Sequence, residues 1–279
     1  MAIGIACTVI LGIFLGLKFF EKYIPVNERY HTCLVTGASS GIGCELARQM
    51  VHRGWKVIGI ARRVQLLDSL ATELGKDNFI PYICDVGNPE EVHTISEQIK
   101  ARGLKPTLFF LNAGMGGQDL PYQISTQQHK TMFNVNYFGV VAWVEEWLAP
   151  VKSYGGGTFV ATSSIFSLYA PPARAGYSAS KTALNSCFKS LRLQYLSDNI
   201  NFAVVAPGPV ATAMLKTRKP LPCIRQPAET ARYIIDQVFK GERFIEPTWF
   251  YKITLPILKM LPDTVVLKIL APFHFECKK

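Results

Sequence analysis

Residues 36–43 read TGASSGIG and follow directly on the apolar run HTCLVT at 31–36. The apolar run is short and continuous, as expected of a buried strand. A helical pattern begins within the glycine stretch and continues from residue 42 to residue 53. The order of strand, glycine turn and helix predicts a unit in which the first N–H groups of the helix, and the positive end of its dipole, face an anion.

Each glycine of this turn has a distinct expected role. Gly37 permits the tight turn, Gly41 lets the backbone approach a pyrophosphate, and Gly43 allows the helix to pack closely on the strand. A glycine pattern alone is weak evidence, but its place between a strand and a helix strengthens it. We expect the same ligand to contact the other residues of the turn, Thr36, Ser39, Ser40 and Ile42.

The alternation of strands and helices continues to residue 206. Further strands are expected at 56–61, 79–84, 107–111, 157–163 and 200–206. Helices are expected at 64–74, 89–101, 126–149 and 175–197. Apolar strands separated by helices indicate parallel strands covered on both faces, and right-handed crossovers then give a doubly wound sheet. We therefore predict an α/β fold of the Rossmann type, with ligands at the carboxyl ends of the strands.

The composition restricts the class of protein. The chain has 279 residues, 49% of them apolar, and a net charge of +10. Its basic residues are scattered, so we expect no nucleic acid partner; an anionic cofactor or an anionic membrane face suits the charge better. The seven cysteines include no CxxC pair and the five histidines no HxxxH pair. A reducing compartment is therefore expected, with no disulfide framework and no metal site.

The first residues of the chain are apolar. Residues 2–17 carry no charge, and Lys18, Lys22 and Arg29 follow them. A membrane anchor over 1–25, a buried core helix and a cleaved signal peptide are all compatible with this run, although the signal peptide would need basic residues before it. We favour the anchor. The charges after it predict a catalytic domain facing the cytosol, at the endoplasmic reticulum in a eukaryote or the inner membrane in a bacterium.

The other end of the chain is also apolar. Residues 249–275 are rich in aromatic and aliphatic side chains and are interrupted by prolines. They are too broken to span a membrane as one helix. Two interpretations stay open: a cover packed on the substrate side of the core, or a patch that dips into the membrane interface. We accordingly expect one catalytic domain at 31–247 and a separate apolar segment at 248–279.

The end of the second expected strand concerns the choice of nucleotide. An acidic side chain there would bond the ribose hydroxyl of NAD. This chain has Arg62 and Arg63 instead, and two guanidinium groups suit the additional phosphate of NADP. Both arginines could also simply face solvent. Asp85 and Val86, after the third strand, are placed to meet the adenine.

The segment YSASK at 177–181 combines an acid–base group with a cation. Tyr177 and Lys181 are four residues apart at the start of an expected helix, so they share a face. A tyrosine titrates near ~10 and is a poor acid–base group at neutral pH. A lysine cation beside it lowers the pKa of the phenol. Ser164, at the end of the fifth strand, could then donate a hydrogen bond to the oxygen that exchanges the proton.

Together these motifs resemble the short-chain dehydrogenase/reductase family over residues 31 to about 245. The family's TGxxxGxG appears at 36–43 and its YxxxK at 177–181. Its serine lies 13 residues before the tyrosine, which selects Ser164 over Ser163. The resemblance further implies a fourth catalytic residue, Asn136 in NVNYFG, that holds a water linking Lys181 to bulk solvent.

The resemblance also implies further contacts with the nucleotide. Lys181 binds the nicotinamide ribose beside Tyr177, and PGPVAT at 207–212 resembles the family's loop under the nicotinamide. The cofactor-binding residues implied in these segments are Asn112, Ala113, Gly114, Pro207, Gly208, Val210 and Thr212. One departure is visible, because the family's NNAG reads LNAG here. Leu111 replaces the first asparagine, and we expect a small effect.

The resemblance implies an NADPH-dependent oxidoreductase, here of a membrane-associated lipid or steroid type. Its substrate would be a lipophilic ketone or alcohol, such as a steroid, a retinoid, a 3-ketoacyl or a 3-ketosphinganine lipid. The mixed apolar and basic segment at 213–227 is expected to cover it. Two alternatives are a catalytically silent nucleotide-binding membrane scaffold and a lipid-binding protein. A homo-oligomer formed through the long helices is a further expectation from the family.

Overall fold

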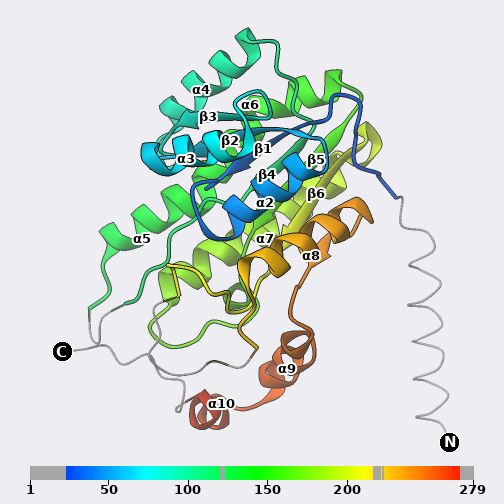
Figure 1. Cartoon of the computed structure of the whole chain (residues 1–279). Helices are drawn as coiled ribbons and strands as arrows, with labels where there is room; N and C mark the ends of the chain where they lie inside the picture. Colours follow the sequence, from blue (N-terminus) through cyan, green and yellow to red (C-terminus); the bar gives the residue numbers. More distant parts are fainter. Residues whose placement is uncertain (1–22, 120–122, 216–220, 222, 271–279) are drawn as a thin grey trace, which may run out of the picture.

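The computed structural model describes residues 23–119, 123–215, 221 and 223–270 (Figure 1). These residues form a seven-stranded parallel sheet in the order β3-β2-β1-β4-β5-β6-β7. The strands are β1 (Thr32–Thr36), β2 (Lys56–Ala61), β3 (Phe79–Ile83), β4 (Leu108–Leu111), β5 (Gly157–Thr162), β6 (Ile200–Val205) and β7 (Phe244–Ile245). The predicted doubly wound α/β fold is therefore confirmed.

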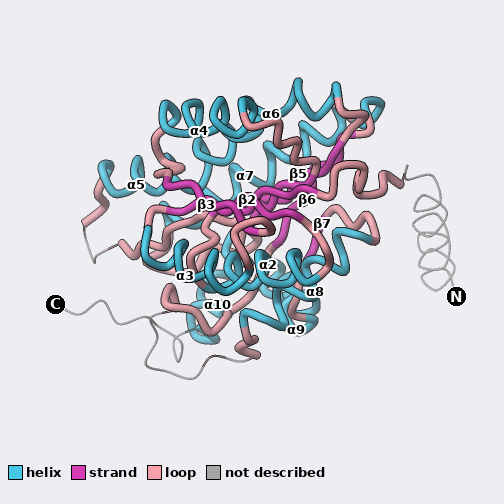
Figure 2. The backbone as a smooth tube through the Cα atoms, turned by 45° about the horizontal axis from the view of Figure 1, so that its top comes forward, coloured by secondary structure: helices cyan, strands magenta, loops and turns pink. Residues whose placement is uncertain are grey.

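Helices cover both faces of the sheet, as Figure 2 shows. One face packs against α2 (Gly41–His52), α3 (Val64–Leu74) and α8 (Pro227–Phe239). The other face packs against α4 (Pro89–Ala101), α6 (Gly139–Ser153) and α7 (Ala175–Gln194). Successive side chains of one strand enter opposite layers, because the side chains of a strand alternate between its faces. Cys33 and Val35 lie in the first core and Leu34 in the second, all fully buried.

Aromatic side chains on neighbouring strands hold the middle of the sheet together. Phe109, Phe159 and Phe202 occupy paired positions on β4, β5 and β6. Their rings stack with centroids 4.6 Å and 5.2 Å apart. All three are fully buried, and each such pair contributes about 0.5–1.5 kcal/mol beyond its buried area. The strands that carry the cleft are thus fixed relative to one another.

The helix predicted over 126–149 differs from the one observed. The chain forms α5 (Thr126–Phe133), then a π-helical turn at Asn134–Phe138, and then α6. A π turn inserts an extra residue into the helical repeat and turns side chains that would otherwise face elsewhere. Here it contains Asn136, which is completely buried. The helix predicted over 175–197 ends at Gln194, followed by a short 3₁₀ turn at Leu196–Asp198.

Elements beyond residue 206 were not predicted one by one. Helix α8 and the two-residue strand β7 complete the sheet, and α9 (Trp249–Met260) and α10 (Asp263–Leu270) follow. The ring of Tyr251 lies against Gly208, and Leu255 is buried. Trp249, with 69% of its surface exposed, lies on the outer side of the same helix. One face of α9 therefore packs on the core, and the opposite face is exposed.

No helix within the described ranges is long and apolar enough to cross a membrane. The expected anchor over 1–25 lies almost wholly outside those ranges, which begin at Tyr23. Part of the segment expected to cover the substrate, residues 216–220 and 222, lies outside them as well. The same holds for residues 271–279 of the apolar carboxyl-terminal segment.

Candidate active site

A cleft of about 710 Å³ opens at the carboxyl ends of the parallel strands. The turns after β1, β2, β3, β4, β5 and β6 all contribute to its lining. The site predicted from the sequence lies there almost entirely. The lining includes Gly37, Ser39, Ser40, Gly41, Ile42, Arg62, Arg63, Asp85, Val86, Asn112, Ala113, Gly114, Ser164, Tyr177, Lys181, Pro207, Gly208, Val210 and Thr212.

Three predicted site residues are described but do not line the cleft: Thr36, Gly43 and Asn136. Each supports a residue that does. The Thr36 hydroxyl oxygen accepts a 2.9 Å hydrogen bond from the Ala113 amide. A side chain on Gly43 would place its Cβ 2.3 Å from the Gly37 carbonyl oxygen. Only a glycine at this position lets α2 approach the turn so closely.

The glycine turn has the backbone that its sequence predicts. Gly37 and Gly41 have φ angles of +70° and +58°, in the left-handed region that side chains disfavour. The Cβ of any residue replacing Gly37 would lie 3.0 Å from the Ala113 backbone. Helix α2 begins at Gly41, so its first N–H groups face the cleft without a side-chain cap. The turn therefore presents backbone N–H donors to the cleft, and a Cβ at Gly37 or Gly41 would take up space beside them.

Two arginines from the β2–α3 connection close one end of the cleft. The Arg63 guanidinium donates to the Ser39 hydroxyl oxygen through Nε at 3.1 Å and Nη2 at 2.8 Å, and it also contacts Ser40. Arg62 pairs with Asp85 at 3.3 Å and keeps 70% of its side chain exposed. Arg63 is therefore held against the glycine turn, whereas Arg62 is largely exposed and pairs with Asp85 instead.

Asn112 links three strands below the cleft. Its Nδ2 donates to the Thr36 carbonyl oxygen at 3.3 Å, and its Oδ1 accepts from the Thr162 hydroxyl at 3.3 Å. Leu111, where the family pattern has asparagine, is fully buried in the core between the sheet and α6. The substitution places an apolar side chain in an apolar layer, consistent with the small effect expected.

The two serines after β5 have different surroundings. The Ser163 hydroxyl donates a 3.2 Å hydrogen bond to the Lys181 carbonyl oxygen, a contact that ties β5 to α7. The Ser164 side chain instead forms a hydrogen bond with Tyr177. Its hydroxyl oxygen also accepts from the Phe166 amide at 3.2 Å. Of the two, Ser164 is the serine that reaches the tyrosine hydroxyl.

The surroundings of Tyr177 only partly match the expectation. Burial raises the pKa of the phenol above its usual range, while the Ser164 hydrogen bond and the positive charge of Arg174 act to lower it. The expected lowering by Lys181 is not among these contributions. The Lys181 ammonium lies 6.0 Å from the centre of the tyrosine ring, and burial lowers the pKa of that lysine to about 8. Burial makes the ammonium costly to form, but with this pKa the lysine is still charged at neutral pH, and its ammonium donates to the Thr162 carbonyl oxygen at 2.7 Å.

Three hydrogen bonds fix the Asn136 side chain at the back of the site. Its Oδ1 accepts from the Met115 amide at 2.9 Å, and its Nδ2 donates to the Met115 carbonyl at 3.0 Å and to Ser180 at 3.1 Å. A Cβ on Gly114 would lie 3.2 Å from this Oδ1 and 3.4 Å from the Lys181 Nζ. Gly114 therefore lets the asparagine and the lysine lie close together behind the cleft.

The loop after β6 forms the opposite wall. The Pro207 carbonyl oxygen accepts from the Ile165 amide at 3.2 Å, which joins this loop to the one that carries Ser164. The methyl group of Thr212 lies against Gly41, where a Cβ would be 3.0 Å away. The glycine turn and the loop after β6 therefore meet across the cleft.

Several lining residues were not singled out from the sequence, among them Met115, Ile165, Phe166 and Arg174. Met214, Leu215 and Leu221 also line the cleft, and they belong to the segment at 213–227 that was expected to cover the substrate. Phe166 packs edge-on against the Tyr177 ring, with centroids 6.3 Å apart. Arg174 could have been noticed because it lies directly before α7, three residues ahead of Tyr177.

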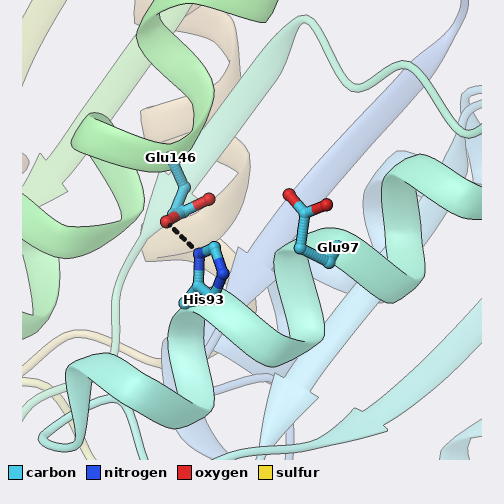
Figure 3. Close-up of side chains that lie close together, drawn as sticks. All are labelled: His93, Glu97 and Glu146. Carbon is cyan, nitrogen blue, oxygen red and sulfur yellow. Dashed lines mark hydrogen bonds and ion pairs between the residues drawn. The ribbon is translucent and has the colours of Figure 1, made fainter.

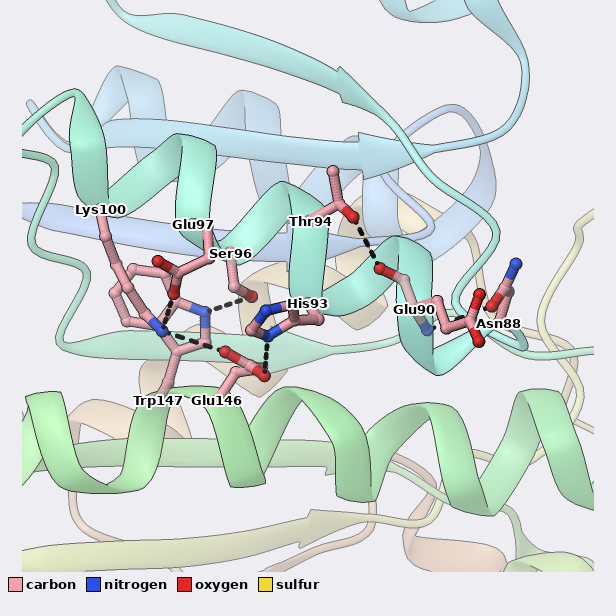
Figure 4. A network of polar contacts seen from close by, with 9 residues as sticks. All are labelled: Asn88, Glu90, His93, Thr94, Ser96, Glu97, Lys100, Glu146 and Trp147. Atoms are coloured by element: carbon pink, nitrogen blue, oxygen red, sulfur yellow. Dashed lines mark hydrogen bonds and ion pairs between the residues drawn. The ribbon is translucent and has the colours of Figure 1, made fainter.

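A separate polar network lies outside this cleft, between α4 and α6. His93, Glu97 and Glu146 bring potential metal-ligand atoms within 4.8 Å of one another (Figure 3). The Lys100 ammonium already bonds both carboxylates, at 2.8 Å and 3.0 Å, and His93 bonds Glu146 at 2.7 Å. Figure 4 shows how these contacts join the two helices. A cation of the chain itself thus already binds both carboxylates of the cluster, and we assign no metal to it.

Burial alone would raise the pKa of Glu146, but its hydrogen bonds to His93 and Lys100 outweigh burial and lower it. The hydrogen bond to Glu146 in turn raises the pKa of His93. Trp147 donates to the Ser96 hydroxyl at 3.1 Å beneath the same network. The cluster therefore ties α4 to α6 at a distance from the candidate active site.

Comparisons with known proteins agree with this geometry. A family model described as short chain dehydrogenase matches residues 31–221. The uncharacterized oxidoreductase YbbO of Escherichia coli is 29% identical over 258 residues, which cover 85% of this chain and 93% of that one. The NADPH-dependent 1-acyldihydroxyacetone phosphate reductase of Saccharomyces cerevisiae is 32% identical over 191 residues, 68% of this chain and 64% of the yeast protein.

A solved structure shares the fold. The alcohol dehydrogenase of the archaeon Thermococcus sibiricus, complexed with 5-hydroxy-NADP, superposes with a TM-score of 0.69 at 26% identity. The match covers 77% of this chain and 94% of the archaeal one. The family match at 31–221 includes every described residue that lines the cleft.

Proposed function

The chain belongs to the short-chain dehydrogenase family, whose members are oxidoreductases acting on CH–OH and C=O groups, and from this premise we propose that it is an NADPH-dependent reductase of a lipophilic ketone. The reverse oxidation of the alcohol would use the same groups. The observation that carries the proposal is the meeting of Ser164, Tyr177 and Lys181 beside the glycine turn in one cleft.

The cleft suits a nicotinamide dinucleotide. Gly37 and Gly41 have positive φ angles and no side chains, so a pyrophosphate can approach the backbone closely. The uncapped N–H groups at the start of α2 can then bind it. Arg63, fixed on Ser39 and Ser40, supports recognition of a 2′-phosphate. The names of the yeast and archaeal relatives contain NADPH and NADP, which agrees with this choice.

The acid–base steps follow from the side chains around Tyr177. When bound, the reduced cofactor supplies a hydride to the carbonyl carbon. Ser164 donates a hydrogen bond to the carbonyl oxygen and so favours negative charge on it. Tyr177 gives its hydroxyl proton to that oxygen. Because burial raises the pKa of the phenol, the hydroxyl is protonated before the reaction begins. Lys181 holds the ribose hydroxyls and supports the transient phenolate.

Asn136 acts behind these groups. Its amide fixes Met115 and Ser180, and Gly114 places it near the Lys181 ammonium. We propose that it positions Lys181 and the water that resupplies the Tyr177 proton. The second lone pair of its Oδ1 can accept a hydrogen bond from that water.

Apolar side chains at the substrate end support a lipophilic substrate. Met115, Phe166, Met214 and Leu221 line the cleft there. The yeast relative is named for an acylated ketone, which is lipophilic as well. We further propose that the protein works at a membrane, with its catalytic domain in the cytosol. The uncharged run at 2–17 and the open apolar face of α9 support this placement.

The proposal is tested by following NADPH and NADH oxidation by detergent-purified protein with a panel of lipophilic ketones. Tyr177→Phe removes only the hydroxyl, and we expect turnover to fall by about 10²–10⁴-fold, the usual contribution of a positioned acid. NADPH binding should persist in the variant. Unchanged turnover would exclude Tyr177 as the acid. Tight NADPH binding without any tyrosine-dependent turnover would favour a nucleotide-binding scaffold instead.

A further inference from the structure

Arg174 occupies a fixed place at the start of α7. Its Nη1 donates a 2.7 Å hydrogen bond to the Gly117 carbonyl oxygen. The Asp119 carboxylate accepts from the Ala175 amide at 2.8 Å and contacts the His129 ring nitrogen at 2.8 Å. The Asp119 amide donates to the Ala173 carbonyl at 3.0 Å. The loop after β4 is thus hydrogen-bonded to Ala173 and Ala175, the two neighbours of Arg174 in the chain.

The Arg174 side chain lines the cleft beside the candidate catalytic tyrosine. Its charge is near enough to the Tyr177 hydroxyl to act on the pKa of that group. The other charged side chains among the described lining residues are placed differently. Arg62, Arg63 and Asp85 lie at the end next to the glycine turn. Lys181 is directed to the Thr162 carbonyl oxygen at 2.7 Å.

Apolar side chains make up much of the described lining at this end. Met115, Ile165, Phe166, Met214, Leu215 and Leu221 contribute to it. Among the described residues, a substrate in this space meets the Arg174 guanidinium, the Ser164 and Tyr177 hydroxyls and these apolar side chains. Such a lining favours a molecule with a long apolar part and an anionic group.

We infer that Arg174 forms an anion site for the substrate, which binds a phosphate or carboxylate carried close to the reacting carbonyl while the apolar wall binds the rest. A guanidinium has five N–H donors in a planar fork, whose geometry matches two oxygens of a phosphate or carboxylate. The inference rests on the proposed function, because it places the reacting carbonyl at Tyr177. It narrows the substrate class to acidic lipophilic ketones.

Two ketones that differ only in the anion test this site. Palmitoyl dihydroxyacetone phosphate carries a phosphate next to the ketone, and palmitoyl dihydroxyacetone lacks it. For the wild-type protein we expect kcat/KM to be about 10- to 100-fold higher for the phosphate, the range of one charge-assisted hydrogen bond. In Arg174→Met the ratio should approach one, and Arg174→Lys should restore part of it. Arg192→Met, on the same helix outside the cleft, should leave the ratio unchanged.

The ratio separates substrate recognition from other effects of Arg174. Loss of its charge near Tyr177, or of its bond to Gly117, lowers the rates with both ketones alike and cancels in the ratio. A ratio that stays the same in Arg174→Met, or a wild-type protein without preference for the phosphate, overturns the inference.

A binding experiment separates this inference from the proposed function. Dodecyl phosphate and dodecanol are titrated calorimetrically into full-length protein with oxidised nucleotide present. We expect Arg174→Met to weaken dodecyl phosphate binding by about 10-fold or more and to leave dodecanol binding unchanged. This outcome in a protein that turns over neither ketone would sustain the anion site and reject the reductase. Equal binding of dodecyl phosphate by variant and wild type would reject the anion site.

Discussion

The Lys181 ammonium donates a 2.7 Å hydrogen bond to the carbonyl oxygen of Thr162, the last residue of β5. This bond fixes the lysine at the floor of the cleft, where only 3% of its surface is exposed. Burial lowers its pKa to about 8. The lysine therefore loses its charge within a pH range in which most proteins remain folded. The affinity of any ligand that needs the cation should fall over the same range.

Nucleotide binding should weaken on the alkaline side because of Lys181. Below pH 8 the ammonium is present, and above it a proton must be taken up for the cation to bind the ribose. We expect the dissociation constant of NADPH, measured by fluorescence, to rise by up to about 10-fold per pH unit above that point. Tyr177→Phe should keep this dependence. Lys181→Met should bind more weakly at pH 7 and lose the dependence; if the dependence persisted in Lys181→Met, another group would be its source.

Replacement of Arg63 should change the preference between the two nucleotides. Its guanidinium is bound to Ser39 and Ser40 at the start of the glycine turn, where it can contact a 2′-phosphate. We expect Arg63→Met to raise the KM for NADPH by about 10- to 100-fold, the cost of one or two charge-assisted hydrogen bonds, with little change for NADH.

Arg62→Met should have the smaller effect, because Arg62 is largely exposed and already paired with Asp85. Arg53→Met is a suitable control, since Arg53 pairs with Asp236 outside the cleft. Equal losses for NADPH and NADH in Arg63→Met would show that the arginine supports the turn rather than selects the phosphate.

The sequence predicts the features that local patterns determine. The strands up to residue 206 are continuous apolar runs because both of their faces are buried, and their observed ends lie within one or two residues of the expected ones. The glycine turn was equally clear, since the backbone at Gly37 and Gly41 requires glycine. The place of the cleft followed from the rule that ligands bind at the carboxyl ends of parallel strands, whereas many of its residues, such as those at 112–114 and 207–212, were implied by the family resemblance.

Features that depend on distant contacts were not predicted. The π turn around Asn136 is stabilised by bonds to Met115 and Ser180, which are remote in sequence. Strand β7 has two residues, too few for a periodic pattern. Helix α8 did carry a local signal, with Pro227 in its first turn and Glu229 after it. The raised pKa of Tyr177 follows from burial, which the spacing of YSASK does not disclose.

Helix α9 should insert its open face into lipid. Trp249, Ile253, Ile257 and Met260 recur at helical spacing and are all exposed, whereas the other three tryptophans, Trp55, Trp143 and Trp147, are buried. We expect brominated lipids in anionic vesicles to quench the fluorescence of the full-length protein through Trp249. In Trp249→Phe the quenching should vanish. Protein that sediments with vesicles while its Trp249 fluorescence is unquenched would show that this face does not meet the bilayer.

Glu246, directly after β7, should make stability fall as the pH rises. Its carboxyl is buried, its Oε1 has no hydrogen-bond partner among the described residues, and burial raises its pKa from 4.5 to about 7 despite the nearby Lys252. Between these values the folded protein holds a proton that the unfolded chain has released, so the free energy of unfolding decreases as the pH rises and the decrease is complete above pH 7.

Glu246→Gln keeps the shape of this side chain and removes its charge. We expect the variant to match the wild type near pH 4.5 and to be more stable at pH 8 by about 1–2 kcal/mol, a value reduced for partial solvent screening. Thermal unfolding at the two pH values, followed by circular dichroism, measures the difference as a melting temperature raised by a few degrees. Glu242→Gln changes an exposed carboxylate nearby and should have no such effect. A variant of Glu246 that is less stable than the wild type at pH 8 would mean that the charged carboxylate has a partner in solution.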